Sequence, residues 1–162
     1  MAWLDEAGEE EVLVRRSRAV GLPGALPDVY GLALRVPVLG DHHGDLLFAT
    51  TGLGPLGRFV LHPTWSPAGQ PMTTLLPYAG PEGAVMLAAV PRAEDRFDLA
   101  CASLRTPWRM FAELTLLAED GPDPLLSFDP VRNTVPGLDN YGWVRRLREP
   151  AYVVARRTRR ED

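Results

Sequence analysis

The sequence predicts a mainly β protein of the α+β kind: an antiparallel sheet or barrel followed by a short C-terminal helix. The apolar runs are short and alternate with polar residues, as strands with one buried face do, and turns rich in glycine and proline separate them. The chain of 162 residues contains 15 glycines and 16 prolines, and 46% of its residues are hydrophobic. This is enough for one sizeable core, so we expect a single domain over residues 1–162.

Seven segments have the length and alternation of strands. Between positions 30 and 36, for example, Leu32 and Leu34 alternate with Ala33 and Arg35. The seven segments are 11–17, 30–36, 45–51, 58–62, 84–90, 97–104 and 109–117. Turn residues cluster between them at 21–24, 40–44, 52–57 and 77–83, and segment 63–83 is expected to be a loop because it holds five prolines.

The glycines of segment 52–57 (G-L-G-P-L-G) match the spacing of a phosphate-binding loop. That fingerprint needs a helix directly after it, whereas the apolar run 58–61 follows here. We therefore interpret the segment as a hairpin turn.

A helix is predicted only near the C-terminal end. Asp139 or Asn140 is a suitable N-cap, and Pro150 ends or restarts the helix. One face of this helix would carry Tyr141, Val144 and Leu147.

Charge and composition exclude several classes of function. The net charge of −4 gives no overall case for nucleic-acid binding, and we expect none. No apolar run reaches the ~18 residues of a membrane span, and the acidic N-terminal stretch does not resemble a signal peptide. We expect a cytoplasmic protein without membrane contact, in which the single Cys101 is a small core residue.

Three stretches, in this order, resemble the catalase family. The first is V-R-R-S-R-A-V-G at 14–21, followed by D-V-Y-G-L-A-L-R at 28–35. The second is the apolar strand 108–117, followed by F-D-P-V-R-N-T-V-P-G-L at 128–138. The third is 148–159, where catalases carry R-x-F-x-Y-x-D-T-x-x-x-R. The resemblance implies a catalase-like β-barrel that carries a haem.

The resemblance assigns a role to individual residues. Tyr152 matches the tyrosine whose phenolate binds the iron of haem b, and Arg148 matches the arginine that keeps this phenol ionised. Arg159 and Arg15 match arginines that pair with the haem propionates, and Ser17 matches a serine on the distal, peroxide-binding side. Asp28 and Asn133 match positions that we interpret as structural. Without the resemblance, the same arginines are surface charges and Tyr152 is a half-buried aromatic.

Departures from the family limit the prediction. No histidine precedes segment 14–17, where catalases place their distal acid–base, and segment 45–52 lacks the distal asparagine. Pro150 replaces an aromatic residue, and Val154-Ala155 replaces the Asp-Thr pair. The barrel could also be short by one strand, and a second copy of the chain or a further N-terminal segment would then cover its edge. We expect a homo-oligomer.

The histidines of the chain do not replace the missing distal residue. His42 and His43 are expected in an exposed turn, where a metal site with Asp41 and Asp45 is the less favoured alternative. His62 is expected to be a surface or capping residue.

The sequence therefore predicts a haem-binding catalase-like protein. A peroxidase that acts on a peroxide or a small organic hydroperoxide is the enzymatic form of this prediction, and catalase activity itself is not expected. A carrier that binds haem without peroxide turnover is an intermediate form. The alternative is a degenerate, haem-free catalase-fold domain that serves as a binding or partner module.

Overall fold

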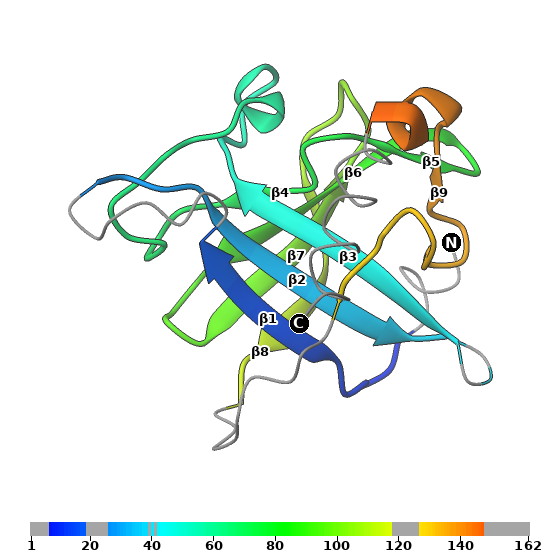
Figure 1. The fold of residues 1–162 in the computed structure, drawn as a ribbon, viewed down its shortest axis with the longest axis horizontal. Coiled ribbons are helices and arrows are strands. Elements are labelled where there is room, and N and C mark those ends of the chain that lie inside the picture. Colours follow the sequence, from blue (N-terminus) through cyan, green and yellow to red (C-terminus); the bar gives the residue numbers. More distant parts are fainter. Residues whose placement is uncertain (1–6, 19–25, 39, 41, 118–126, 148–162) are drawn as a thin grey trace, which may run out of the picture.

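The computed structural model describes residues 7–18, 26–38, 40, 42–117 and 127–147. In it the chain forms a curled antiparallel sheet that resembles half of a barrel (Figure 1). The strands and the single 3-10 helix are β1 (Leu13–Arg18), β2 (Tyr30–Pro37), β3 (His43–Thr50), η1 (Gly57–Phe59), β4 (Met72–Thr73), β5 (Tyr78–Gly80), β6 (Gly83–Pro91), β7 (Arg96–Ala102), β8 (Arg109–Thr115) and β9 (Asp139–Asn140). The mainly β prediction is confirmed.

Strand β6 is the centre of the hydrogen-bonded order. It pairs with β4, β5 and β7, while β4 continues through β3 and β2 to β1, and β7 continues to β8. The β7–β8 register shifts between Leu99 and Ala100, an irregularity of the bulge type that increases local twist. Among the described strands β1, β8 and β9 end the order, and no ladder joins β1 to β8.

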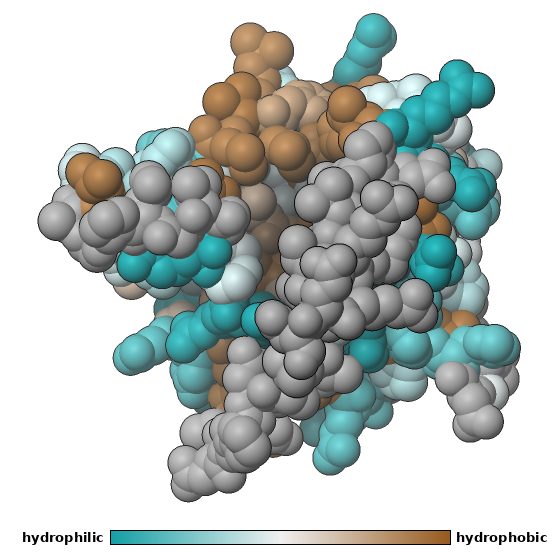
Figure 2. All heavy atoms as spheres, in the orientation of Figure 1, coloured by the Kyte–Doolittle hydropathy of each residue, from teal (hydrophilic) through white to brown (hydrophobic). Residues whose placement is uncertain are grey.

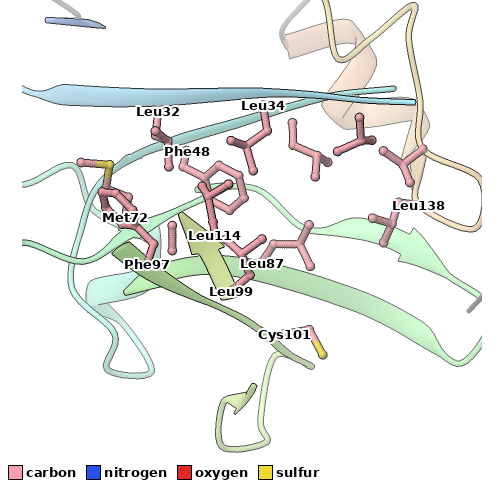
Figure 3. Close-up of a cluster of buried hydrophobic side chains, with 14 of the residues drawn as sticks. Leu32, Leu34, Phe48, Met72, Leu87, Phe97, Leu99, Cys101, Leu114 and Leu138 are labelled. Carbon is pink, nitrogen blue, oxygen red and sulfur yellow. The ribbon is translucent and has the colours of Figure 1, made fainter. Parts of the chain in front are cut away.

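The core lies between the two halves of the curled sheet. Figure 3 shows Leu32 and Leu34 pointing from one half toward Leu87 and Leu99 on the other, with Phe48 between the two halves. Alternate residues of each strand reach this core because successive side chains of a strand point to opposite faces. The core members therefore follow the alternation that the sequence predicts for β2, β3, β6 and β7.

A turn-rich segment, residues 127–138, crosses one end of β3 and leads into the short helix at 142–147 (Figure 1). Val135, Leu138 and Val144 are buried at 1% exposure each and fix this segment to the core. Gly44 on β3 permits the close approach, because a Cβ there would lie 2.5 Å from Val135 Cγ2. Val135 and Leu138 extend the same core cluster.

Six of the seven predicted strands correspond to β1, β2, β3, β6, β7 and β8. The strand predicted at 58–62 is wrong. The chain turns tightly at Gly52, whose N–H donates to Gly57 O at 3.1 Å, and η1 follows; only a single bridge between Thr51 and Leu61 remains. Within the segment expected to be a loop, β4 and β5 form instead.

The C-terminal helix starts later than predicted. Asp139 and Asn140, the expected N-caps, form β9 and pair with β5, and the helix begins at residue 142. Val144 is buried as expected, but Leu147 is 63% exposed, so the predicted apolar face is only partly used. No helix in the described part of the chain is long and apolar enough to span a membrane.

Candidate functional site

Arg15 and Ser17 lie on the face of β1 that points away from the core. Val12 and Val14 pack against the core, so the alternation of the strand directs Arg15 and Ser17 to the opposite face. The register places Arg15 beside Ala33 and Ser17 beside Gly31 on β2. Arg15, which the resemblance matches to a propionate-binding arginine, and Ser17, which it matches to a distal-side serine, therefore share one surface, which we call the outer face of β1–β3.

Small residues form much of this outer face. Gly31 pairs with Ala49 of β3, and Ala33 pairs with Leu47. A Cβ at Gly31 would lie 2.9 Å from Ser17 Oγ, so the serine side chain packs over the glycine and would have to shift to admit a larger residue. Gly31 and Ala49 are partly exposed in the row of Ser17, whereas Ala33, which pairs with Arg15, is buried at 8% exposure.

A buried ion pair holds one end of the outer face. Arg35 Nε and Nη2 donate to the two carboxylate oxygens of Asp45 at 2.8 and 3.0 Å, and the Asp45 side chain is fully buried. Asp45 Oδ2 also accepts from Asn133 Nδ2 and from the backbone N–H of Asp129, both at 2.8 Å. This network fixes segment 127–138 against β3, and it agrees with a structural role for Asn133.

The network determines the protonation of Asp45. Burial alone would raise the pKa of the carboxyl group, but the hydrogen bonds from Arg35, Asn133 and the Asp129 backbone together hold this pKa below its usual value. The carboxylate is therefore charged and fully engaged with protein donors. This removes Asp45 as a metal ligand beside His42 and His43, and Asp41 lies outside the described residues.

A second buried carboxylate belongs to Asp28 and pairs with Arg18, which the alternation of β1 places on the face opposite to Arg15 and Ser17. Asp28 is 1% exposed, and Arg18 Nε lies 3.3 Å from Asp28 Oδ2. The guanidinium of Arg18 also stacks over the ring of Tyr30, 5.8 Å from its centroid. Asp28 pairs with Thr64 in an isolated antiparallel bridge, so its role here is to join β2 to the loop that contains Thr64.

The described histidines differ in their distance from the row that contains Ser17. His62 lies near it, because its backbone N–H donates to the carbonyl oxygen of Thr50 at 2.8 Å, and Thr50 follows Ala49, which the β1–β2–β3 pairing joins through Gly31 to Ser17. His43 begins β3, six residues before Ala49, which corresponds to about 20 Å along a strand. His42 and His62 are exposed. In the described part of the chain no group of three or more His, Cys, Asp and Glu side chains is arranged to hold a metal.

The remaining residues of the predicted haem site, Tyr152, Arg148 and Arg159, lie outside the described residues. Cys101 is buried at 7% exposure in the core cluster, as predicted. Comparison of the chain with known protein families, curated proteins and solved structures gave no match.

Sequence reasoning missed a second site, a cleft of about 530 Å³ between the turn 53–58 and the β7–β8 connection. Arg58 lies in its wall and is 4% exposed, with its guanidinium 4.6 Å from the ring centroid of Trp108. The run Arg58-Phe59-Val60-Leu61 alternates weakly and therefore suggested a strand. The signal that could have corrected this is the glycine pair at 52 and 57, which permits a close backbone approach.

Proposed function

We propose that this chain is a haem-binding protein of the catalase-like group and that the outer face of β1–β3 contributes to its haem site. The observation that carries the proposal is the shared orientation of Arg15 and Ser17, which the resemblance places on the haem side. Both lie on the face opposite the core, next to Gly31 and Ala33. Residues two positions apart in a strand always share a face, so the support lies in which face this is, namely the one opposite the core.

The described residues fit part of a haem site. Ser17 and half-buried Arg15 share the outer face, and Arg15 has a side chain suited to a carboxylate. In the proposed site Arg15 and Arg159 hold the propionates, Tyr152 is the iron ligand, and Arg148 favours its phenolate form. Bound haem would supply the iron chemistry that acts on a peroxide or organic hydroperoxide.

Peroxide turnover would need an acid–base beside Ser17. His43 lies about 20 Å along β3 from the row of Ser17, and His62, which lies nearer to it, is exposed. Ser17 is exposed and its hydroxyl can donate or accept a hydrogen bond, which suits it to orienting a ligand rather than to moving protons at neutral pH. We therefore propose haem binding with weak or no catalase activity, and a hydroperoxide as the substrate class if turnover occurs.

Arg15 and its neighbour Arg16 provide a matched test. The two side chains point to opposite faces of β1, and Arg16 Nη1 donates to the Glu94 carbonyl oxygen at 3.4 Å. Titration of the purified protein with haem should show weaker binding in Arg15→Ala and unchanged binding in Arg16→Ala. Equal haem affinity of both variants would contradict a contribution of the outer face to the haem site.

A haem-free binding module is the second candidate. It is favoured by the exposed apolar side chains around η1, where Leu56 is 82% and Val60 is 61% exposed. Exposed apolar patches of this kind mark interaction surfaces. Haem titration separates the two candidates, because a module of this kind would give no haem spectrum.

Self-association is part of the proposal. Strands β1 and β8 are the two long strands among the three that end the hydrogen-bonded order of the described strands, and such end strands pair readily with another chain. Light scattering of the purified protein should give a mass above the 17.8 kDa of one chain. A strictly monomeric protein would contradict the proposed self-association.

A further inference from the structure

The cleft between the turn 53–58 and the β7–β8 connection combines two cations with an apolar wall. Its lining residues are Leu53, Pro55, Arg58, Leu104, Arg105, Thr106, Pro107 and Trp108. Two arginines are present and no acidic residue is, so the wall is cationic and otherwise mostly apolar. The volume of about 530 Å³ lies within the range of small-molecule sites, which is roughly 300–1,000 Å³.

Arg58 is a buried cation without a carboxylate. Its Nε, Nη1 and Nη2 donate to the carbonyl oxygens of Gly54, Ser103 and Leu53 at 3.3, 3.2 and 3.4 Å. No carboxylate of the described residues forms an ion pair with it within 4.0 Å. Charged groups buried in proteins are normally paired, so this guanidinium favours an anion that the described residues do not supply.

The geometry leaves donors for such an anion. A guanidinium has five N–H groups, and three long hydrogen bonds use three of them. The aromatic face of Trp108 lies on the guanidinium and neutralises none of its charge. Exposed Arg105 stands in the same wall and adds a second positive charge at the mouth.

The cleft is held in shape before any ligand arrives. Trp108 Nε1 donates to the Leu53 carbonyl oxygen at 2.9 Å, which joins the two walls. The backbone N–H of Arg58 donates to Gly54 O at 3.1 Å, and Thr73 Oγ1 donates to Arg58 O at 2.8 Å. A preformed site avoids part of the ordering cost of binding.

Apolar surface continues from the cleft onto the end of the molecule. Leu104 is 43% exposed, and Leu56 and Phe59 at 82% and 38% follow the lining residues along the turn. Figure 2 shows apolar side chains gathered at the top of the view, where η1 and the β7–β8 connection lie in Figure 1. A ligand whose anionic head reaches Arg58 therefore meets apolar surface along the rest of its length.

We propose that this cleft binds a free amphiphile with a carboxylate head and an alkyl or aryl body. The carboxylate is held by Arg58 and Arg105, and the body lies against Leu53, Leu104 and Trp108. The site is separate from the outer face of β1–β3 and does not depend on haem.

Haem-free protein and decanoate provide the test. The chain has four tryptophans, and the indole N–H resonance of Trp108 is identified in a ¹H–¹⁵N spectrum by its loss in Trp108→Phe. We expect this resonance to shift saturably with decanoate. The affinity for decan-1-ol and for butyrate should be at least tenfold lower, because decan-1-ol lacks the carboxylate and butyrate lacks the long alkyl chain. Equal responses to decanoate and decan-1-ol would overturn the role of the arginines, and no response would overturn the site.

Variants locate the carboxylate. Arg58→Met should weaken decanoate binding by about tenfold or more, because a hydrogen bond to a charged group is lost in a buried place. Arg105→Gln, on exposed surface, should fold normally and weaken binding about threefold, and exposed Arg132→Met elsewhere should change nothing. If Arg58→Met fails to fold, Arg105→Gln decides: unchanged affinity in that variant overturns the proposal. Binding to phosphatidylglycerol vesicles without binding to monomeric decanoate would also overturn it, in favour of a membrane surface.

Discussion

Replacing Asp45 by asparagine should destabilise the protein strongly. The fully buried carboxylate accepts two hydrogen bonds from Arg35, one from Asn133 and one from the Asp129 backbone. The asparagine amide would keep the shape of the side chain, but it would remove the negative charge and turn one acceptor into a donor that faces other donors. Removal of one partner of a buried pair costs about 3–5 kcal/mol, and we expect about 3 kcal/mol because the Arg35 side chain remains 18% exposed.

Urea unfolding at pH 7, followed by tryptophan fluorescence, measures this loss. With a slope of about 2 kcal/mol per molar urea, a loss of about 3 kcal/mol lowers the midpoint by about 1.5 M. Exposed Asp139→Asn is the matched control and should leave the midpoint unchanged. Arg35→Met should also be costly, and the double variant should lose less than the sum of the two single losses because both remove the same pair.

The same variant should change the response to acid. The pKa of Asp45 in the folded protein lies below that of an unfolded aspartate, which is about 3.9, so the unfolded chain binds more protons as the pH falls toward and below 4. The contribution of Asp45 is therefore present above pH 4 and is lost as the pH falls through the folded pKa. The stability difference between wild type and Asp45→Asn should shrink over this range. A midpoint shift below about 0.5 M at pH 7, or a difference that grows in acid, would refute the reasoning.

Further predictions concern packing. Gly44→Ala should lower the free energy of unfolding by about 1–3 kcal/mol, since its Cβ would lie 3.1 Å from the Val135 backbone. Thermal unfolding measures this loss, with Gly40→Ala as the comparison. A Cβ at Gly40 meets no neighbour, although the positive φ of 80° there adds strain of its own. Leu34→Ala should cost about 2–5 kcal/mol because the residue is 1% exposed, whereas Leu56→Ala at 82% exposure should cost little; equal losses in urea would contradict the assigned core. Gly31→Val should lower the affinity for haem, because the valine side chain would collide with Ser17 Oγ on the outer face. A haem titration of Gly31→Val that matches wild type would contradict this.

Local patterns in the sequence predicted most of the sheet. Leu32 and Leu34 alternate with smaller or polar neighbours, and six of the seven runs predicted as strands form strands. The failures came where tertiary contacts outweigh local pattern. Arg58 turns inward to three carbonyl oxygens, so the apolar run that it begins cannot pair as a strand. Asp139 and Asn140 have N-cap chemistry, but pairing with β5 uses their backbone first.

The candidate site was predictable only in part. The alternation along β1 was enough to place Arg15 and Ser17 on one face, since it needs no knowledge of other strands. The cleft at Arg58 and Trp108 unites residues 50 positions apart, and no local pattern indicates that they meet. The Asp45 network likewise depends on a segment more than 80 residues away.

The most direct test of the haem proposal is the absorption spectrum of the protein purified with haem supplied, compared with that of Tyr152→Phe. The proposal predicts a Soret band in the wild type and a shifted or strongly weakened band in the variant, because the phenolate that binds the iron is gone. A band unchanged in Tyr152→Phe would contradict ligation by the tyrosine. The absence of any Soret band in the wild type would contradict haem binding altogether.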